Sequence, residues 1–281
     1  MTKIGFLHPG AMGISLAVSA QNSGHEAYWI SDERSKETRE RAEEYHLIDA
    51  KTLTLLTQTC SVIISICPPA AAEEVAKSVA ALSFHGLYLD ANAISPQRAL
   101  RIQEIVENTG ARFVDGSVIG GPAWKSKNTW LQLSGDYAQN IAILFSKGPL
   151  ETNIIGKEIG KASALKMAYA AYSKGTAALL AAILATAENF DVRKELETQW
   201  TKYEPEFVEE AHARTKRVTA KAWRFAGEMD EIAETFAEAG MPSGFHEAAG
   251  EIYQRIAHLK DAEKTPELDV VLRELLNLEQ L

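Results

Sequence analysis

The sequence is poor in cysteine, with only Cys60 and Cys67 among 281 residues. Two cysteines in a chain of this length do not make a disulfide framework, and this pair is not a Cys-x-x-Cys motif. We therefore expect both thiols to be small core residues in a reducing compartment, which favours a cytoplasmic location. No metal site is expected.

Positive charge is also scarce: 29 Lys and Arg residues stand against 38 Asp and Glu residues, a net charge of −9. This balance argues against a nucleic-acid surface or an anionic membrane surface, because phosphates would be repelled overall. No signal peptide fits the first residues, and no apolar run is expected to span a bilayer. Small-molecule partners are favoured.

The sequence does have ample apolar material, since 46% of its residues are hydrophobic. Over residues 1–160, short β-like runs alternate with helical segments, which is typical of a parallel sheet with crossover helices. We therefore predict an α/β Rossmann-type, doubly wound parallel sheet as a dinucleotide-binding domain. Its expected strands are Ile4–Leu7, Ala27–Ser31, Val62–Cys67, Leu87–Asp90, Phe113–Val118 and Trp130–Ser134.

The β pattern ends after Gly160. Residues 163–190 form an Ala/Leu-rich stretch that predicts one helix of about 28 residues, roughly 40 Å long. We predict an all-helical C-terminal domain over residues 161–281, which begins with this long interdomain helix. Two apolar stripes at helical spacing support it, namely Met229, Ile232, Ala233 and Phe236, and then Phe245, Ala249, Ile252 and Ile256.

Residues 3–13, KIGFLHPGAMG, run from an apolar strand through a Pro/Gly loop into a helix. The start of such a helix offers unpaired N–H groups to a pyrophosphate. The dinucleotide fingerprint Gly-x-Gly-x-x-Gly falls on residues 8–13, so a histidine stands at its first glycine. The sequence predicts a cofactor-binding loop formed by His8, Pro9, Gly10, Ala11 and Met12.

The segment SDERSK, about 20 residues beyond the fingerprint, should face the adenosine ribose. Ser31 and Arg34 would hold a 2′-phosphate, whereas Asp32 or Glu33 would accept hydrogen bonds from a free 2′-hydroxyl. We expect the strand to end on Ser31, which favours NADP(H), with NAD(H) as the alternative.

Later strand ends supply further candidates, because ligands of open α/β sheets lie at the carboxyl edge. Cys67 and Pro68 would form a wall against a ring, unless they are a plain strand-to-helix turn. Asn92 would bond a ribose or amide of the cofactor, with Asp90 orienting its loop. Gly120 and Gly121 would offer two N–H groups to a carboxylate or oxyanion, a tight turn being the alternative.

Lys166 is the strongest candidate for a catalytic group. Its small, apolar neighbours and the positive end of the helix would favour a neutral amine. Such an amine can accept a proton from an alcohol as hydride leaves the same carbon. Lys161 and Lys174 are nearby alternatives, and a lone helical lysine is ordinarily a surface residue.

The segments HPGAMG, DANAISP, DGSVIGGP and GKASALK follow the order and spacing of the β-hydroxyacid dehydrogenase family, related to 6-phosphogluconate dehydrogenase. Over nearly its whole length the chain resembles this family, and within it the branch with a distinct helical C-terminal domain. The resemblance implies an NAD(P)-dependent enzyme, a homodimer and an active-site cleft between domains. It makes Lys166 the catalytic lysine, and Gly120 and Gly121 the glycines that anchor the substrate.

Departures from the family pattern fall in the pocket. Ile119 stands where a serine usually binds substrate, and Tyr169 where an asparagine is usual. Tyr169 lies one turn beyond Lys166, so it is a candidate to bind substrate or steer the lysine, or else a packing aromatic. His246 is a candidate substrate contact from the C-terminal domain. A kept lysine with lost polar groups predicts hydride chemistry on a larger or less polar substrate.

Three functions remain open. The first is an NAD(P)-dependent oxidoreductase that interconverts a hydroxyl and a carbonyl on a small, carboxylate-bearing substrate, with Lys166 as general acid and base. The second is an imine reductase, which resembles the same scaffold but typically replaces the lysine with an acid or a tyrosine. The third is a catalytically silent dinucleotide-binding sensor, suggested by His8 and the lost polar residues.

Overall fold

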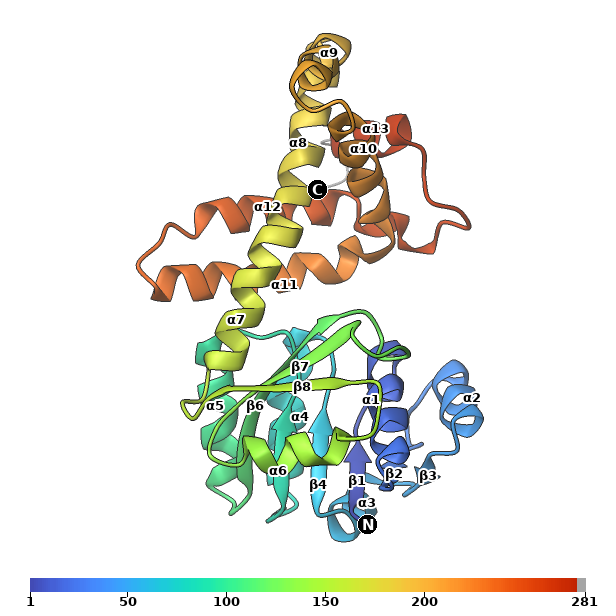
Figure 1. Cartoon of the computed structure of the whole chain (residues 1–281), viewed down its shortest axis with the longest axis vertical. Coiled ribbons are helices and arrows are strands. Elements are labelled where there is room, and N and C mark those ends of the chain that lie inside the picture. The colour runs from blue at the N-terminus through green and yellow to red at the C-terminus, as the bar shows by residue number, and fades with distance from the viewer. Residues whose placement is uncertain (277–281) are drawn as a thin grey trace. The chain divides into compact units, whose positions relative to one another are not determined.

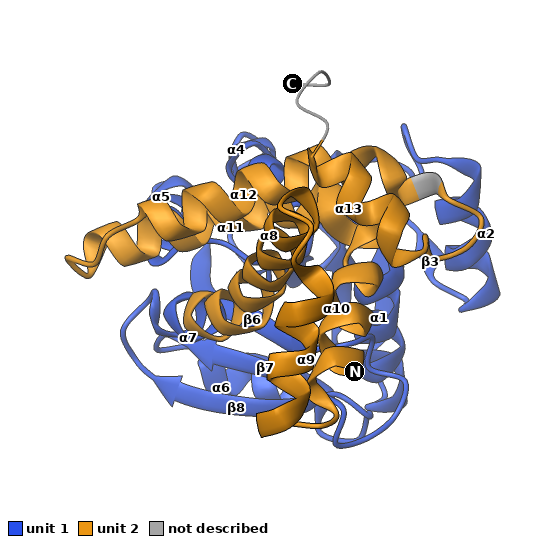
Figure 2. Cartoon of the chain, turned by 90° about the horizontal axis from the view of Figure 1, so that it is seen from above, with its two compact units in different colours: residues 1–166 blue, residues 167–281 orange. Residues whose placement is uncertain are grey.

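A computed structural model describes residues 1–276 of the chain. The chain divides into two compact units, Met1–Lys166 and Met167–Leu281 (Figure 2). The predicted helical domain runs to residue 281, so its residues 277–281 lie outside the described part.

The first unit is built on an eight-stranded sheet with the order β3-β2-β1-β4-β5-β6-β7-β8 (Figure 1). Because the strand order reverses between β1 and β4, the carboxyl ends of these two strands mark the usual ligand site of a doubly wound sheet. The predicted α/β Rossmann-type fold is thus confirmed. The strands are β1 Lys3–Phe6, β2 Glu26–Trp29, β3 Ile48–Asp49, β4 Val62–Ser65, β5 Leu87–Asp90, β6 Arg112–Gly120, β7 Thr129–Ser134 and β8 Glu151–Gly156.

Helices cover both faces of this sheet, because successive strand residues point to opposite sides. On one face, Val62 and Ile64 of β4 join a core with α1 and α6; on the other, Ile63 joins a core with α3, α4 and α5. The helices of this unit are α1 Ala11–Asn22, α2 Lys36–Glu44, α3 Leu53–Thr59, α4 Ala72–Ala80, α5 Pro96–Glu107 and α6 Ala138–Ala142, and a 3₁₀ turn, Pro69–Ala71, precedes α4.

The predicted strands need correction at four places. β2 ends at Trp29, two residues before Ser31. β7 runs antiparallel to β6, because their short connection leaves no room for a crossover helix. β3 and β8 were not expected at all: β3 has two residues, and edge strand β8 is only partly buried and lacks a continuous apolar run.

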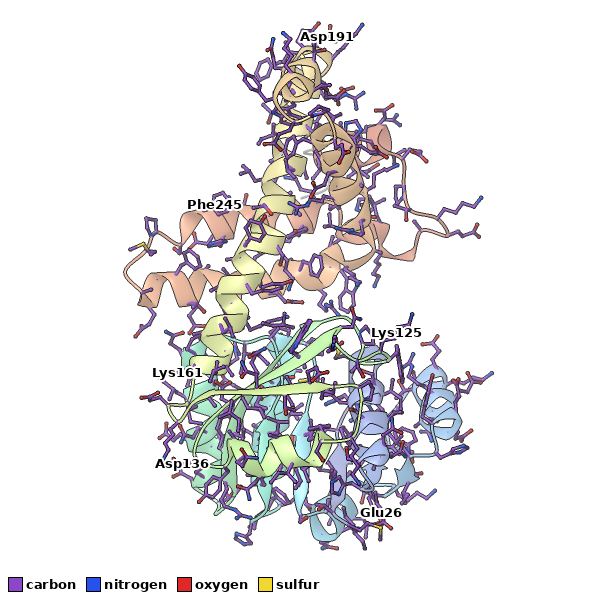
Figure 3. All side chains as sticks on the ribbon, in the orientation of Figure 1. Glu26, Lys125, Asp136, Lys161, Asp191 and Phe245 are labelled. Carbon is purple, nitrogen blue, oxygen red and sulfur yellow. The ribbon has the colours of Figure 1, made fainter. Side chains whose placement is uncertain are left out.

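Labelled side chains show which end of the sheet carries the candidate site. Glu26 begins β2 and Asp136 follows the antiparallel β7, and both lie at one end of the sheet (Figure 3). Lys125, in the loop after β6, lies at the opposite end, where the parallel strands finish. The loops after β1, β4, β5 and β6 therefore share one edge.

A continuous helix, Lys161–Asn189, begins in the first unit and continues into the second. It consists of α7 Lys161–Ala170, a π-helical turn Ala171–Gly175 and α8 Thr176–Asn189, which confirms the predicted long helix. By length and composition alone it could cross a bilayer, contrary to the expectation from the sequence. Since 56% of its most apolar window is buried, the same helix also fits the core of a soluble protein.

The described part of the second unit is helical, as predicted. One apolar stripe is confirmed, since Met229, Ile232 and Ala233 are buried and Phe236 is half-buried. The other stripe is confirmed in part: Ala249 and Ile256 are buried and Ile252 is half-buried, but Phe245 is 49% exposed. The buried face of α12 also carries His246, Gly250 and Tyr253. Gly250 lies against Met229, so part of this buried face is formed by a glycine, which hydrophobic periodicity does not detect. The helices are α9 Arg193–Tyr203, α10 Phe207–Arg217, α11 Ala222–Glu238, α12 Gly244–Arg255 and α13 Leu268–Leu276.

Candidate cofactor and active site

The loop between β1 and α1 has the geometry of a phosphate cradle. A Cβ on Gly13 would lie 2.2 Å from the carbonyl oxygen of His8, so only glycine lets α1 approach the strand end this closely. At Gly10, which caps α1, a Cβ would meet no heavy atom within 4 Å. One glycine thus permits tight packing and the other leaves open backbone, as a dinucleotide fingerprint requires. His8 has no positive φ, so this turn does not need glycine there.

Two distant segments flank the cradle. Arg41 of α2 donates a hydrogen bond from Nη1 to the carbonyl oxygen of Pro9 at 3.3 Å. In the loop after β6, the N–H of Ala123 donates to the Oγ of Ser15 at 2.9 Å. The next residue, Trp124, is 44% exposed and stacks on Tyr45 with ring centroids 5.1 Å apart. The start of α1 is therefore held from both sides.

A cavity of about 300 Å³ opens beyond the carboxyl ends of β1 and β2. Its apolar walls suit a purine ring, and its charged groups come from the loop that follows β2. It lies where the adenosine half of a dinucleotide binds in doubly wound sheets. The residues that line it are Leu7, His8, Ile30, Asp32, Glu33, Arg34, Leu53, Val75 and Ser78.

Two residues that line this cavity carry a buried polar atom without a hydrogen-bond partner among the described residues: Nδ1 of His8 and Nε of Arg34. Burial, together with the nearby charge of Arg34, lowers the pKa of His8 to about 4. Burial also lowers the pKa of Arg34, although Glu33 and Asp32 oppose this shift. His8 is therefore a neutral ring at physiological pH, and both groups suit a polar ligand.

Ser31 is already engaged within the protein. Burial raises the pKa of Asp49, but hydrogen bonds from Lys51 and from the Ser31 side chain bring it below its usual value. Asp32 and Glu33 are exposed. Of the predicted ribose-side pair, Arg34 is thus the member with an unmatched donor.

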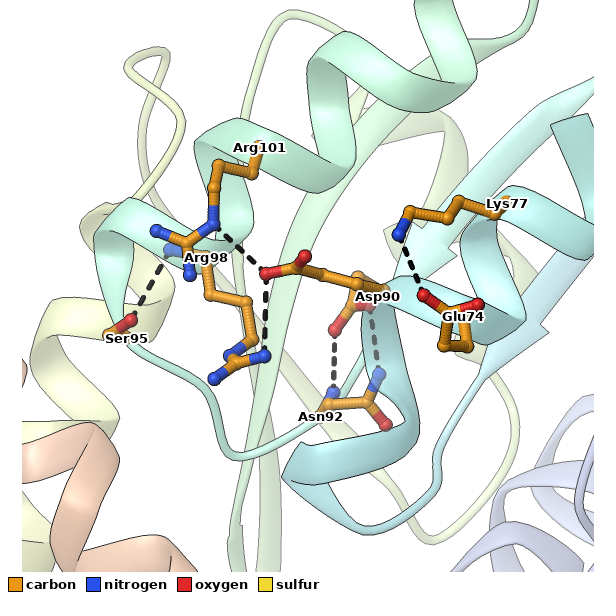
Figure 4. A network of polar contacts seen from close by, with 8 residues as sticks. Glu74, Lys77, Asp90, Asn92, Ser95, Arg98 and Arg101 are labelled. Carbon is orange, nitrogen blue, oxygen red and sulfur yellow. Dashed lines mark hydrogen bonds and ion pairs between the residues drawn. The ribbon is translucent and has the colours of Figure 1, made fainter.

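Asn92 lies inside a buried network rather than on the surface, with 2% of its area exposed. Its side-chain amide donates to the carboxylate of Asp90 at 2.8 Å, as Figure 4 shows, and its oxygen accepts the N–H of Cys67 at 2.5 Å. It thereby ties the loop after β5 to the loop after β4. Burial raises the pKa of Cys67 to about 12, so this thiol stays protonated beside Pro68.

The first turn of α7 is fastened to β6 by a buried carboxylate. Oδ2 of Asp115 accepts the N–H groups of Gly160 at 2.9 Å and Ala162 at 3.0 Å, and Oδ1 accepts the hydroxyl of Ser163 at 2.7 Å. Two residues along β6, the hydroxyl of Ser117 donates to the carbonyl of Ala162 at 2.7 Å. Burial raises the pKa of Asp115, against the lowering effect of the hydrogen bonds from Ser163 and Ser134.

Lys166 follows one turn later on α7, and its Nζ donates to the carbonyl oxygen of Val118 at 2.7 Å. Val118 directly precedes Ile119, Gly120 and Gly121, so the lysine lies at the base of the predicted substrate loop. Gly120 needs its φ of +114°, and a Cβ there would lie 2.3 Å from the carbonyl oxygen of Asn128. At Gly121 a Cβ would meet nothing within 4 Å.

Two predicted substrate contacts, Tyr169 and His246, belong to the second unit. Tyr169 is 50% exposed on the long helix. His246 is only 4% exposed, with its ring against Phe236 and Phe245, and burial lowers its pKa. Of the alternative lysines, Lys161 pairs with Glu158, and Lys174 pairs with Glu228 in the interior of the second unit.

The sequence did not single out Asp115, Ser117 and Ser163, which fasten α7, nor the pairing of Trp124 with Tyr45. The sequence does carry a signal for the first set: Asp115 and Ser117 are two residues apart in β6, so two polar side chains lie on the same face of this buried strand. Among the described residues, no group of three or more His, Cys, Asp or Glu side chains is arranged to hold a metal ion.

Two family models match the chain. Residues 3–140 match the NAD binding domain of 6-phosphogluconate dehydrogenase, and residues 187–256 match DUF1932, a domain of unknown function. Fold and cradle define the class, a Rossmann-type NAD(P)-binding protein. The two matches confirm the predicted resemblance to the 6-phosphogluconate dehydrogenase-like family, with a helical C-terminal domain of its own kind.

Individual proteins are similar to the chain in sequence or in fold. An uncharacterized 28.5 kDa protein of Methanothermus fervidus is 31% identical over 164 residues, which is 58% of this chain and 62% of the relative's length. A conserved protein of unknown function, described as structurally similar to 3-hydroxyacid dehydrogenases, superposes with a TM-score of 0.69 and 26% identity, covering 92% of this chain and 98% of the other.

Two more distant structures show the fold alone. A 3-hydroxyisobutyrate dehydrogenase of Mycobacterium tuberculosis with L-serine has a TM-score of 0.71 and 17% identity, covering 98% of this chain and 99% of the other. An imine reductase of Myxococcus stipitatus with NADP⁺ has a TM-score of 0.57 and 18% identity, with the same coverage.

Proposed function

We propose that the protein is an NAD(P)-dependent oxidoreductase that interconverts a hydroxyl and a carbonyl group on a small, carboxylate-bearing substrate. The observation that carries this proposal is the place of Lys166, whose Nζ lies 2.7 Å from the carbonyl of Val118 at the base of the loop with Gly120 and Gly121. That loop follows β6 at the same sheet edge as the cradle.

The residues of the cradle fit a dinucleotide, because the open backbone at Gly10 and the first turn of α1 offer N–H groups to a pyrophosphate. The bound nicotinamide would supply the site that accepts or donates hydride. Lys166, as a neutral amine, would accept the hydroxyl proton of the alcohol and return it in the reverse direction. The backbone at Gly121, which is open, would hold the substrate carboxylate.

We assign the cofactor as NADP(H) rather than NAD(H). The unmatched Nε of Arg34 in the adenosine cavity supports this choice, because a guanidinium pairs well with phosphate. The sequence argument for NADP(H) relied on a strand that ends at Ser31. That argument no longer holds, because β2 ends at Trp29. Equal or tighter binding of NADH than of NADPH would refute the assignment.

The experiment follows nicotinamide absorbance over panels of hydroxy acids with NADP⁺, and of carbonyl compounds and imines with NADPH. Lys166→Ala should lower kcat about 10²- to 10⁴-fold, the usual worth of a general acid or base, while NADPH affinity stays within about twofold. Lys161→Ala, five residues earlier on α7, is the matched control and should retain turnover. A Lys166→Ala variant with nearly full activity would refute the role.

The same panels separate the alternatives. Turnover of imines but not of carbonyl compounds would identify an imine reductase, the activity named for the fold neighbour of Myxococcus stipitatus. Tight NADPH binding without any turnover would identify a sensor. The homodimer and the cytoplasmic location stay predictions, and light scattering of the purified protein checks the first.

A further inference from the structure

The histidine at the first fingerprint position lines the adenosine cavity, together with Arg34. Both side chains carry a buried polar atom without a hydrogen-bond partner, Nδ1 in His8 and Nε in Arg34. Because the two residues line one cavity, a ligand group that accepts hydrogen bonds there would match both atoms, as buried polar groups ordinarily are. An anion with several oxygen atoms can satisfy both at once.

We propose that His8 is a specificity-determining residue of the cofactor site, which binds the 2′-phosphate of the adenosine ribose together with Arg34 and takes up a proton when it does so. This inference rests on the dinucleotide site of the proposed function. It does not depend on Lys166 or on the substrate.

Electrostatics explain why His8 would take up a proton when a 2′-phosphate binds but not when a ribose 2′-hydroxyl binds. Burial and the charge of Arg34 keep His8 neutral, with its pKa at about 4. A phosphate dianion beside the ring neutralises Arg34 and adds negative charge, which favours the imidazolium and raises the pKa of His8. A ribose 2′-hydroxyl carries no charge, so it leaves the ring neutral.

The other charged groups of the cavity explain why a phosphate would need protonated His8 in addition to Arg34. Asp32 and Glu33 line the same space and oppose an anion, although both are exposed and therefore screened by solvent. Arg34 is the one guanidinium among the lining residues, and Leu53, Val75 and Ser78 from α3 and α4 carry no charge. The thiol of Cys67, which also acts on Arg34, stays protonated. Protonated His8 and Arg34 together would balance the two carboxylates.

The test uses titration calorimetry with two probes, adenosine 2′,5′-bisphosphate and adenosine 5′-monophosphate, between pH 6.5 and pH 8.5. Buffers of different ionisation enthalpy give the number of protons taken up. For the bisphosphate, the wild type should take up more than about half a proton per site near pH 7, and its affinity should fall at least about fivefold toward pH 8.5. His8→Asn should abolish both effects, and the monophosphate should show neither.

Control variants keep the outcome clear. Arg34→Gln should weaken the bisphosphate at least about tenfold, whereas Lys36→Gln, at an exposed lysine paired with Glu40, should change it less than about twofold. His8→Gln replaces His8→Asn if that variant does not fold.

Three results would overturn the inference. They are bisphosphate binding without proton uptake, equal uptake in the His8 variant, and His8-dependent uptake with the monophosphate, which would place the ring at the 5′-phosphate. If neither nucleotide binds, the dinucleotide site itself fails and the inference falls with it.

Discussion

The hydroxyl of Ser163 donates a hydrogen bond to Oδ1 of Asp115 at 2.7 Å, and Oδ2 of the same carboxylate receives the backbone N–H groups at the start of α7. Asp115 is on β6 and is fully buried. A single side chain of the sheet thus caps the helix that presents Lys166. The position of the lysine along the helix axis depends on this capping contact.

Replacement of Asp115 by alanine leaves several buried N–H groups at the start of α7 unpartnered. We expect a loss of about 3 kcal/mol or more in the free energy of unfolding, because each unsatisfied buried donor costs about 1–3 kcal/mol. Urea unfolding of the first unit, followed by circular dichroism, measures it. Ser163→Ala removes one hydrogen bond and should cost about 1 kcal/mol; equal losses for the two variants would contradict the capping role.

The two glycines of the cradle should respond differently to alanine. In Gly13→Ala the new Cβ meets the carbonyl oxygen of His8 at 2.2 Å, so α1 must move and stability should fall by about 3 kcal/mol. In Gly10→Ala nothing lies within 4 Å, so stability should change by less than about 0.5 kcal/mol while NADPH affinity drops. Thermal melts and cofactor titrations of the pair check this, and a stable Gly13→Ala protein would argue against the close approach.

His8 should make the protein less stable in mild acid. Its pKa is about 4 in the folded protein and 6.5 in an ordinary setting, so between these values the unfolded chain binds the extra proton. The stability that the protein has because His8 stays neutral is fully present above pH 6.5 and is lost as the pH falls toward 4. Between pH 7.5 and pH 5, the free energy of unfolding should fall by about 1–2 kcal/mol less in His8→Asn than in the wild type, after discounting for partial exposure. Parallel urea titrations without cofactor measure this difference, and identical acid losses would show that His8 does not titrate as described.

Most of the sheet could be predicted from the sequence, because β1, β4 and β5 are short, continuous apolar runs that are buried on both faces. β8 could not, since an edge strand with a solvated face carries little apolar signal. On the last predicted apolar stripe, Ala249 and Ile256 are buried as expected, but its first residue was wrong, because Phe245 is apolar but exposed while His246 is polar but buried.

The candidate site was predictable where a fingerprint exists. The strand, the glycines and the helix start of residues 3–13 follow from local physics alone. The roles of Asp115 and Asn92 depend on partners tens of residues away, at Ser163 and Cys67, and no local pattern announces such pairs. Asn92 was expected to contact the cofactor, and its side chain forms hydrogen bonds with Asp90 and with the N–H of Cys67.

The bond from Ala123 to Ser15 spans 108 residues of sequence, and the stack of Trp124 on Tyr45 joins the same two regions. During synthesis the N-terminal segments leave the ribosome long before their partners, because chains emerge at about 5–20 residues per second. A nascent chain that stops short of residue 123 carries the whole fingerprint and still lacks one wall of its cradle. The fingerprint is therefore synthesised first, and the loop that fastens the start of α1 follows about a hundred residues later.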